Sequence, residues 1–409
     1  MSKNPIIMVS SYPPRLCGIA TFTEEAREFI QKANTDRDVL VISHTDGAGE
    51  GVFPIIDLSR RKWWKSVAEK ILELKPSVVH LEHEYGLYEY VNKRGKGDRN
   101  AGFLDLLEAI SDYPTVVEPH TVHGRLKDWE ANFIYQVTRK ATVVLFKCHY
   151  QKWRLEWSIP RYGWEIPGNI MVVPHGARDD KRFGRHKIPK LRRELGFDKI
   201  PTLSSHLVGM IGWIQANKRW DILLSTWKEI CGEIFSRTGQ EWDLLAAGTI
   251  RDPHDKEDYK SWKKKTLRLE KLGLAHYYEF IPRGEIYYKI MAVCDFIVLP
   301  SIDETQSGTL ARIIALNKPF ITTAPMEGLT AQALESEGGL MFTTKKMLKQ
   351  KVMRLACSEK LRHELSENLR RYLDNVVSWK VIAQQYNKAY SLARSAKKSG
   401  NPVKLPMEF

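Results

Sequence analysis

The sequence predicts an α/β protein built from two successive parallel-sheet domains that face each other across a cleft. Short apolar runs alternate with longer amphipathic helical patterns over most of the chain, which is typical of parallel α/β layers. The chain has 409 residues, a length that suggests two domains rather than one. Because ligands of open parallel sheets bind beyond the carboxyl ends of the strands, functional residues are expected directly after the strands.

The expected strands are apolar runs that each end close to a glycine, a proline or a polar turn. In the first half they are Ile6–Ser10, Val39–Ser43, Val78–Glu82, Thr115–Glu118, Val143–Phe146 and Ile170–Val173. In the second half they are Leu207–Ile211, Leu244–Ala247, Tyr278–Phe280, Phe296–Leu299 and Pro319–Thr322. Amphipathic helices such as Glu24–Ala33 and Trp63–Leu74 are expected between them, the first with Thr21 and Glu24 as a capping box.

These elements predict four segments. A first domain covers residues 1–180, a charged linker 181–200 and a second domain 201–380. Residues 381–409 form a C-terminal helix that packs back on the first domain, with a loosely held tail from Ser399.

Composition narrows the classes of partner without choosing one. The formal net charge of +14 suits nucleic acid, an anionic membrane face or phosphorylated small molecules. The five cysteines are scattered and lack metal-ligand spacing, which favours a reducing compartment without disulfides. With no bilayer-spanning apolar run and a short polar start, the expected location is the cytoplasm.

Polar loops follow three of the first-half strands. Gly18 lies in the loop Ser10–Thr21, where it lets the backbone approach a ligand, and the helix that follows offers N–H groups to a diphosphate or a sugar. The segment Glu82–Gly86 ends the third strand, and His120 follows the fourth, where a histidine suits a sugar hydroxyl. An ordinary turn at Gly18 and a core position for a single histidine remain the alternatives.

Two loops stand out in the second half. Gly212–Arg219 follows a strand, and the adjacent cations Lys218 and Arg219 suit a diphosphate leaving group, unless they are simply solvated. The loop Leu299–Arg312 places carboxylates, hydroxyls and a glycine between a buried strand and a helix. Its amides would form an anion site and Glu304 would hold sugar hydroxyls; the alternative is a capped helix start with a solvated acidic loop.

Taken together, these motifs resemble glycosyltransferase family 4, the retaining enzymes of the GT-B fold with two Rossmann-like domains, over nearly the whole chain. The opening Ser10–Phe22 looks like a bacterial and archaeal branch often labelled mannosyltransferases. The motifs His83–Gly86, His120–Val122, Pro174–Gly176 and Leu299–Pro319 also match, and their order and spacing are more specific than any one of them.

The resemblance implies roles for particular residues. His120, Lys218 and Glu304 would be catalytic: His120 contacts the reacting sugar, Lys218 binds phosphate, and Glu304 is the first glutamate of a Glu-x7-Glu motif that binds the donor sugar. The residues expected at the donor are Gly18, Trp213, Arg219, Gln306, Ser307, Gly308, Thr309 and Arg312. Those expected on the acceptor side are Tyr12, His83, Glu84 and His123.

Two positions depart from the family pattern. Arg312 stands where a second glutamate usually binds ribose, and Trp213 stands where an arginine usually follows the glycine. An arginine cannot accept a hydrogen bond from a ribose hydroxyl, although it can contact phosphate. These two changes leave the nucleotide contacts open.

The resemblance further implies transfer with retention of configuration and without a cofactor or a dedicated metal. The branch suggests GDP-mannose as the donor, with UDP-glucose or another UDP-sugar as the alternative, and a saccharide or lipid-linked acceptor. The run Arg60–Lys65 joins cations to two tryptophans, as in proteins that rest peripherally on the inner face of an anionic membrane; inward-packed tryptophans are the alternative.

Three rival functions remain. A nucleotide-sugar epimerase of the same fold would turn over its donor without an acceptor. A catalytically impaired binding protein would bind the nucleotide sugar only. A nucleic-acid-binding protein would account for the charge but not for the strand-end motifs, so no nucleic-acid partner is expected.

Overall fold

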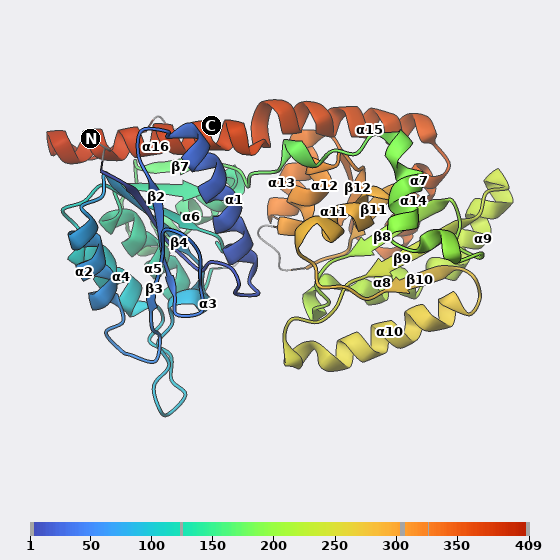
Figure 1. The fold of residues 1–409 in the computed structure, drawn as a ribbon, viewed down its shortest axis with the longest axis horizontal. Coiled ribbons are helices and arrows are strands. Elements are labelled where there is room, and N and C mark those ends of the chain that lie inside the picture. The colour runs from blue at the N-terminus through green and yellow to red at the C-terminus, as the bar shows by residue number, and fades with distance from the viewer. Residues whose placement is uncertain (1–3, 123–125, 303–306, 326, 406–409) are drawn as a thin grey trace. The chain divides into compact units, whose positions relative to one another are not determined.

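The computed structural model describes residues 4–122, 126–302, 307–325 and 327–405. Its contacts divide the chain into two compact units (Figure 1). Unit 1 consists of residues 1–176 together with 379–409, and unit 2 of residues 177–378. None of the described helices combines the length and the hydropathy needed to span a bilayer.

Unit 1 is a parallel sheet covered on both faces by helices. Its described strands follow the order β3–β2–β1–β4–β5–β6–β7, with bounds β1 Ile6–Val9, β2 Val39–His44, β3 Val52–Ile56, β4 Val78–His83, β5 Thr115–Pro119, β6 Val143–Phe146 and β7 Ile170–Val172. Its helices are α1 Gly18–Ala33, α2 Trp64–Leu74, α3 Tyr85–Tyr88, α4 Ala101–Ala109, α5 Asp128–Lys140, α6 His149–Tyr162 and α16 Trp379–Ser399.

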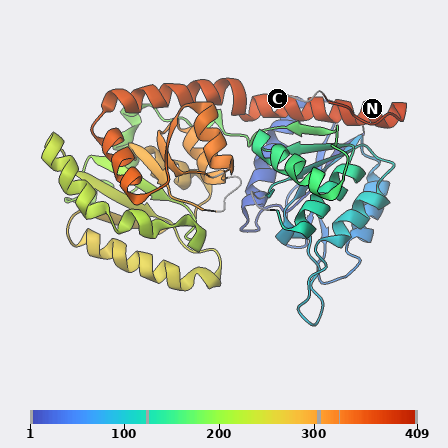
Figure 2. The same ribbon diagram turned by 180° about the vertical axis from the view of Figure 1, so that it is seen from behind.

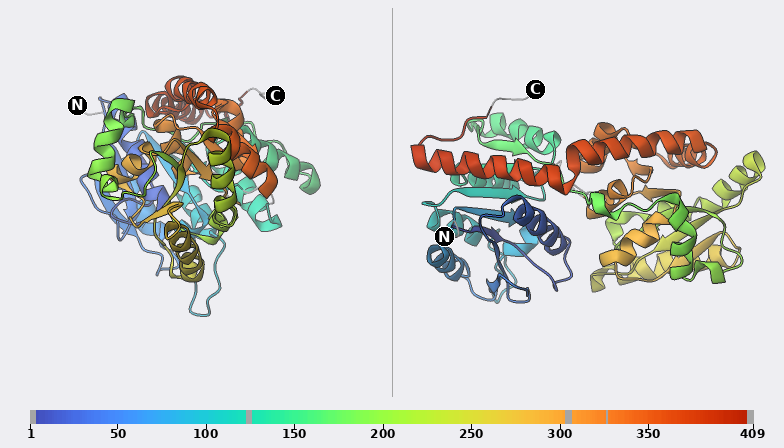
Figure 3. Two further views of the ribbon diagram at one scale, coloured as in Figure 1. Left: turned by 90° about the vertical axis from the view of Figure 1, so that its right-hand side faces the viewer. Right: turned by 45° about the horizontal axis from the view of Figure 1, so that its top comes forward.

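The sheet separates two cores because successive side chains of a strand point to opposite faces. Ile6 and Met8 of β1 pack in one core with α1 and α16, while Ile7 and Val9 pack in the other with α2, α4, α5 and α6. Figure 3 shows α16, in red, lying along unit 1. Its Trp379 donates a hydrogen bond from Nε1 to Glu25 of α1 at 2.9 Å. This contact joins the last helix of the chain to the first.

Unit 2 repeats the same architecture. Its described strands follow the order β10–β9–β8–β11–β12–β13, with bounds β8 His206–Ile211, β9 Trp242–Ala247, β10 Ala275–Tyr278, β11 Phe296–Leu299, β12 Phe320–Thr323 and β13 Gly339–Phe342. Its helices are α7 Ile188–Glu194, α8 Trp220–Leu224, α9 Trp227–Thr238, α10 Lys256–Glu270, α11 Gly284–Ala292, α12 Gly308–Ala315, α13 Glu327–Ser336, α14 Lys345–Ala356 and α15 Glu359–Tyr372. Val208 and Met210 face one core, and Leu207 and Ile211 the other.

The predicted α/β class with two parallel sheets is confirmed, and so are most of its strands to within a residue or two. Tyr278–Phe280 is shifted, since β10 is Ala275–Tyr278. The edge strands β3 and β13 were not expected from the sequence. Pro54 interrupts the apolar run of β3, and proline is tolerated in a sheet only at such an edge.

Three further expectations are wrong in detail. Residues 181–200 are not a linker but fold into unit 2, because Leu191, Leu195 and Phe197 are buried in its core. The capping box of Thr21 and Glu24 does not form, since α1 already begins at Gly18. The tail is held over part of its length: Leu405 donates a backbone hydrogen bond to Gly168 at 2.7 Å.

Candidate functional site

In unit 1, charged side chains gather where β4 and β5 end. The two strands pair in parallel with Glu82 opposite Glu118, so both carboxylates lie near the carboxyl ends of these strands. His120 follows β5 directly, and its backbone N–H donates to His83 O at 2.8 Å, which continues the pairing by one residue. The strand register therefore brings His120 beside the carboxylates.

These side chains form a buried network. Glu82 accepts from Nε2 of His120 at 2.7 Å. His80 of β4 lies between the two carboxylates, with its Nε2 3.4 Å from Glu82 and 3.0 Å from Glu118. Glu118 also forms an ion pair with Lys147, the residue that follows β6. We refer to His80, Glu82, Glu118, His120 and Lys147 as the buried charge network.

Two tyrosines of the C-terminal helix α16 also contact this network. Tyr386 donates its hydroxyl to Glu118 at 3.1 Å, and the hydroxyl of Tyr390 lies 2.8 Å from Nδ1 of His80. An ionised carboxylate can only accept, so Nε2 of His80 carries the proton and Nδ1 accepts from Tyr390. Both tyrosines are fully buried, and burial raises their pKa well above the usual value, so they remain donors.

Burial and neighbouring charges set the ionisation of the network. Burial alone would raise the pKa of Glu82, but His80, the hydrogen bond from His120 and Lys147 outweigh it and lower the pKa. Burial lowers the pKa of His80, which favours its neutral form. Burial also lowers the pKa of Lys147, Glu82 opposes that shift, and the direct ion pair with Glu118 favours the ammonium. His120 thus faces an ionised carboxylate that fixes its Nε2 as a donor.

The start of α1 is linked to this network through one aromatic ring. Phe22 packs edge-on against His120 with ring centroids 4.8 Å apart, and Nζ of Lys147 lies 4.2 Å from the centre of the same ring. Gly18 is the first residue of α1, and a Cβ added there would meet no atom within 4 Å. There is therefore open space beside Gly18 at the start of the helix, the kind of position at which anions bind.

Two of the predicted acceptor-side residues lie elsewhere than expected. His83 is fully buried among Tyr85, Tyr88, Phe103 and Phe133, and its Nε2 lies 3.1 Å from Oδ1 of Asn100. Burial lowers the pKa of His83 to about 3, so it is a neutral core residue. Tyr12 is nearly buried and accepts from Arg27 at 3.3 Å. The structure thus gives both residues packing roles.

Glu84 contacts Thr121, the residue that follows His120. One of its oxygens accepts from the N–H of Tyr85 at 3.0 Å, and the other accepts from the hydroxyl of Thr121 at 2.5 Å. It therefore ties the loop after β4 to the loop after β5. Of the predicted site residues, His123, Glu304 and Gln306 lie outside the described residues.

The predicted site in unit 2 begins with two loops in very close contact. Gly212 follows β8 and Gly248 follows β9, with φ angles of +143° and +153°. A Cβ on Gly248 would lie 1.9 Å from the carbonyl oxygen of Gly212, so only glycine fits. Trp213 is half-buried directly after Gly212, and Gly212 donates to Ala247 O at 3.0 Å.

Lys218 and Arg219 lie a few residues further on. Lys218 ends a short 3₁₀ turn, Ala216–Lys218, and Arg219 takes a left-handed conformation with φ +49° before α8 begins. Arg219 pairs with Asp221 at 3.1 Å. Ile302 donates its N–H to Asn217 O at 2.7 Å, which joins the loop after β11 to this turn.

Helix α12 presents the other half of the predicted donor site. Ser307 caps it by accepting from the N–H of Leu310 at 3.3 Å, and Gly308 and Thr309 form its first turn. The hydroxyl of Thr309 lies 2.8 Å from that of Tyr287. Arg312 donates to Gly308 O at 2.7 Å, and its guanidinium lies 5.1 Å from the ring centre of Tyr287. Arg312 thus braces the first turn of its own helix.

Sequence reasoning missed His80, Glu118 and Lys147, although each lies in or directly after an apolar strand. His80, Glu82 and Glu118 offer atoms within 4.8 Å of one another, a spacing that would suit a metal ion. The ammonium of Lys147 contacts Glu118 in this cluster, so the chain itself supplies the positive charge.

The chain is similar to a protein family over part of its length and to several solved structures over nearly all of it. Residues 194–372 match the family model described as glycosyl transferases group 1. HepE of Anabaena in complex with UDP is similar with a TM-score of 0.68 and 15% identity, over 95% of this chain and 99% of that one. A glycosyltransferase from Rickettsia africae is similar with a TM-score of 0.67 and 14% identity, over 96% of this chain and 99% of that one. A UDP-forming trehalose-phosphate synthase from Burkholderia xenovorans is similar with a TM-score of 0.67 and 9% identity, over 95% of this chain and 99% of that one.

No curated protein matches the sequence. The solved structures are too distant in sequence to show more than the fold. The chain therefore has the GT-B fold, and its residues 194–372 are similar to the glycosyl transferases group 1 family.

Proposed function

We propose that the protein is a glycosyltransferase that moves a hexosyl group from a nucleoside diphosphate sugar to an acceptor hydroxyl. The observation that carries this proposal is the match of residues 194–372 to the glycosyl transferases group 1 model. In the reaction, the bond from the anomeric carbon to the diphosphate breaks, the acceptor oxygen bonds to that carbon, and the nucleoside diphosphate leaves with the proton of the acceptor hydroxyl.

Unit 2 supports the binding of the donor diphosphate. The close approach of Gly212 and Gly248 leaves backbone rather than side chains at the ends of β8 and β9. Lys218 supplies a cation in the turn that follows, and α12 supplies the N–H groups of its first turn. Cations and helix N-termini stabilise the charge that develops on a departing diphosphate, with a single such contact contributing about 2–4 kcal/mol.

Unit 1 supports the handling of the sugar. His120 is oriented by Glu82 so that its imidazole is held as a donor at Nε2, and the ionised carboxylate stabilises a positive charge on the ring. In this proposal, His120 hydrogen-bonds a hydroxyl of the reacting sugar. The N–H groups at the start of α1, beside Gly18, are proposed to bind a phosphate or a sugar hydroxyl of the donor.

Two donors are proposed for testing. HepE of Anabaena has been solved with UDP and with UDP-glucose, which supports a UDP-sugar. The resemblance of Ser10–Phe22 to the mannosyltransferase branch supports GDP-mannose. Retention of configuration, expected from the same resemblance, is part of this proposal.

The decisive experiment incubates the full chain with UDP-glucose or GDP-mannose, with and without candidate saccharide and lipid-linked acceptors. We expect nucleoside diphosphate release that depends on the acceptor, and a product whose anomeric configuration by NMR equals that of the donor. Turnover of the donor without an acceptor would point to an epimerase. Thermal stabilisation without turnover would point to a binding protein.

Lys218→Ala tests the assignment of the diphosphate site. We expect turnover to fall at least about tenfold, because one charge-assisted contact to the leaving group is lost. Lys228→Ala removes an exposed lysine of α9 and should leave turnover unchanged. Full activity of Lys218→Ala would contradict the assignment, and Glu304→Ala would test the sugar contact in the same way.

A further inference from the structure

Helix α6 carries large aromatic side chains on its solvent-facing side. Its inner side buries Gln151, Leu155 and Ile159 against unit 1. Trp153 and Trp157 lie on the opposite side of the helix, one turn apart, and remain 44% and 62% exposed. Figure 2 shows α5 and α6, in blue-green, on the near face of the sheet of unit 1, where α6 covers one core and presents its other side to solvent.

The exposed aromatics form one cluster with cations. The rings of Trp153 and Trp157 are 4.5 Å apart, and Tyr150 lies 5.5 Å from Trp153. The guanidinium of Arg154 is 5.7 Å from the ring centres of both Tyr150 and Trp157. Because these side chains pack on one another rather than on the core, their apolar area is not needed to hold the helix in place.

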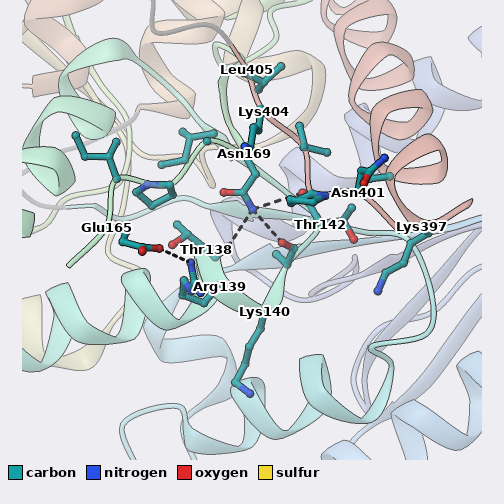
Figure 4. Close-up of a pocket in the computed structure, with 18 of the residues that line it drawn as sticks. Thr138, Arg139, Lys140, Thr142, Glu165, Asn169, Lys397, Asn401, Lys404 and Leu405 are labelled. Carbon is teal, nitrogen blue, oxygen red and sulfur yellow. Dashed lines mark hydrogen bonds and ion pairs between the residues drawn. The ribbon is translucent and has the colours of Figure 1, made fainter. Parts of the chain in front are cut away.

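A pocket of about 990 Å³ borders this face (Figure 4). Lys152 and Glu156 line it from α6, and Ile166, which is largely exposed, lines it from the following loop. Lysine and arginine outnumber aspartate and glutamate in the lining by five to three. Asn169, labelled in Figure 4, lines the pocket and donates to the carbonyl oxygens of Thr138 and Ala141 at 2.9 and 3.0 Å, which holds its side chain in place.

We propose that Tyr150, Trp153, Arg154 and Trp157, with the cationic pocket rim beside them, form a surface by which unit 1 binds an anionic lipid bilayer. Tryptophan and tyrosine favour the boundary between headgroups and acyl chains because one part of each ring system is apolar and another is polar. Neighbouring lysine and arginine side chains add attraction to anionic headgroups, each by about 1 kcal/mol near the surface.

A second copy of the chain fits this surface less well. A two-fold contact would set Arg154 and Lys152 against their own copies, in a protein whose formal net charge is +14. A handful of side chains on one helix also falls far short of the roughly 800 Å² per partner that stable protein interfaces bury. An anionic membrane complements the charge and accepts a small, convex aromatic patch.

The run Arg60–Lys65 offers no comparable surface. Trp63 is only 1% exposed and belongs to the core of unit 1, and Trp64 packs against the same core. Its cations remain on the surface without exposed aromatics, so the membrane contact expected from the sequence is proposed for α6 instead.

Vesicle co-sedimentation tests this proposal independently of catalysis. The full chain is mixed at low salt with vesicles of phosphatidylcholine alone or of phosphatidylcholine and phosphatidylglycerol in equal parts. We expect binding to the anionic vesicles that weakens as salt rises, and little binding to the neutral ones. The double variant Trp153→Ser/Trp157→Ser should bind the anionic vesicles roughly tenfold or more weakly.

The control variant Leu72→Ser/Leu334→Ser removes two apolar side chains of similar exposure, 51% and 60%, from helices α2 and α13. It should bind as the unchanged chain does, and equal melting temperatures would show that both double variants are folded. Unchanged binding of the tryptophan variant, or equal binding to neutral vesicles, would overturn the proposal. So would a tryptophan-dependent dimer in sedimentation equilibrium, which would assign the surface to a second copy.

Discussion

Nε2 of His120 lies 2.7 Å from Oε2 of Glu82, and both side chains are buried at the ends of neighbouring strands. The carboxylate therefore fixes the tautomer and the orientation of the imidazole before any substrate arrives. Such an orienting partner is typical of histidines that act in catalysis. Glu82 is a positioning residue in this scheme, because it acts through His120.

Glu82→Gln should lower transferase activity about tenfold or more. A neutral amide can still accept the hydrogen bond, but it no longer stabilises a positive charge on His120, and hydrogen bonds to charged groups contribute about 1.5–3 kcal/mol. The pH dependence of kcat should shift as well, which a purely structural role would not produce. Glu73→Gln, on the exposed surface of α2, is the matched control. A folded Glu82→Gln protein with an unchanged pH profile would contradict this role.

His83 should make the protein sensitive to acid. Its pKa falls from 6.5 to about 3 on folding because burial disfavours the charged ring. The unfolded chain therefore binds the proton more readily, so the stability that His83 contributes is present above about pH 6.5 and lost as the pH falls towards 3. The loss from this one group should approach about 1.4 kcal/mol per pH unit.

The measurement is the free energy of unfolding as a function of pH for His83→Gln. This variant should be less stable at neutral pH but should show a shallower decline between pH 6.5 and 4 than the unchanged chain. His254→Gln replaces an exposed histidine and should leave the decline as it is. Parallel declines in all three proteins would show that His83 is not the source.

Gly248→Ala should destabilise unit 2 by more than about 2 kcal/mol. Its φ of +153° excludes ordinary side chains, and the added Cβ would clash with the backbone of Gly212, which cannot rotate away. Gly232→Ala is the matched control, because a Cβ there meets nothing within 4 Å and the residue lies inside α9. It should be neutral or stabilising by up to about 1 kcal/mol, as measured by urea unfolding.

Tyr386→Phe should weaken the link between α16 and the buried charge network. The variant keeps the ring but removes the hydroxyl that donates to Glu118, leaving part of a buried carboxylate without that donor. We expect a loss of about 1–3 kcal/mol in the free energy of unfolding. Tyr90→Phe, on a half-buried tyrosine outside the network, should cost far less; equal losses would show that the hydroxyl of Tyr386 adds nothing particular.

The sequence was sufficient for the elements whose pattern is local. Runs such as Val143–Phe146 and Phe296–Leu299 match β6 and β11 because buried parallel strands are apolar on both faces. The two edge strands that were not expected lack such a pattern: β3 includes Pro54 and β13 begins with a glycine. The segment 181–200 looked like a linker because its charges outnumber its apolar residues, although three well-spaced apolar side chains are enough to anchor it.

The buried charge network lay beyond sequence reasoning for a different reason. Its members come from β4, from β5 and the residue that follows it, and from the end of β6, so only the strand register brings them together, and two tyrosines of α16 then contact them. The same limit applied to His83, which looks like His120 in sequence. His83 lies in an aromatic core, whereas His120 lies beside a carboxylate. That difference depends on which face of the sheet each side chain points to.

The return of α16 to unit 1 also has a bearing on how the protein is made. Tyr386 and Tyr390 complete a core that begins with Ile6 and Met8, while all of unit 2 is encoded between them. During synthesis, unit 2 can leave the ribosome and fold while unit 1 still waits for its last helix. The exposed sheet face of the waiting unit is the point at which a chaperone, or aggregation, would act on the nascent chain.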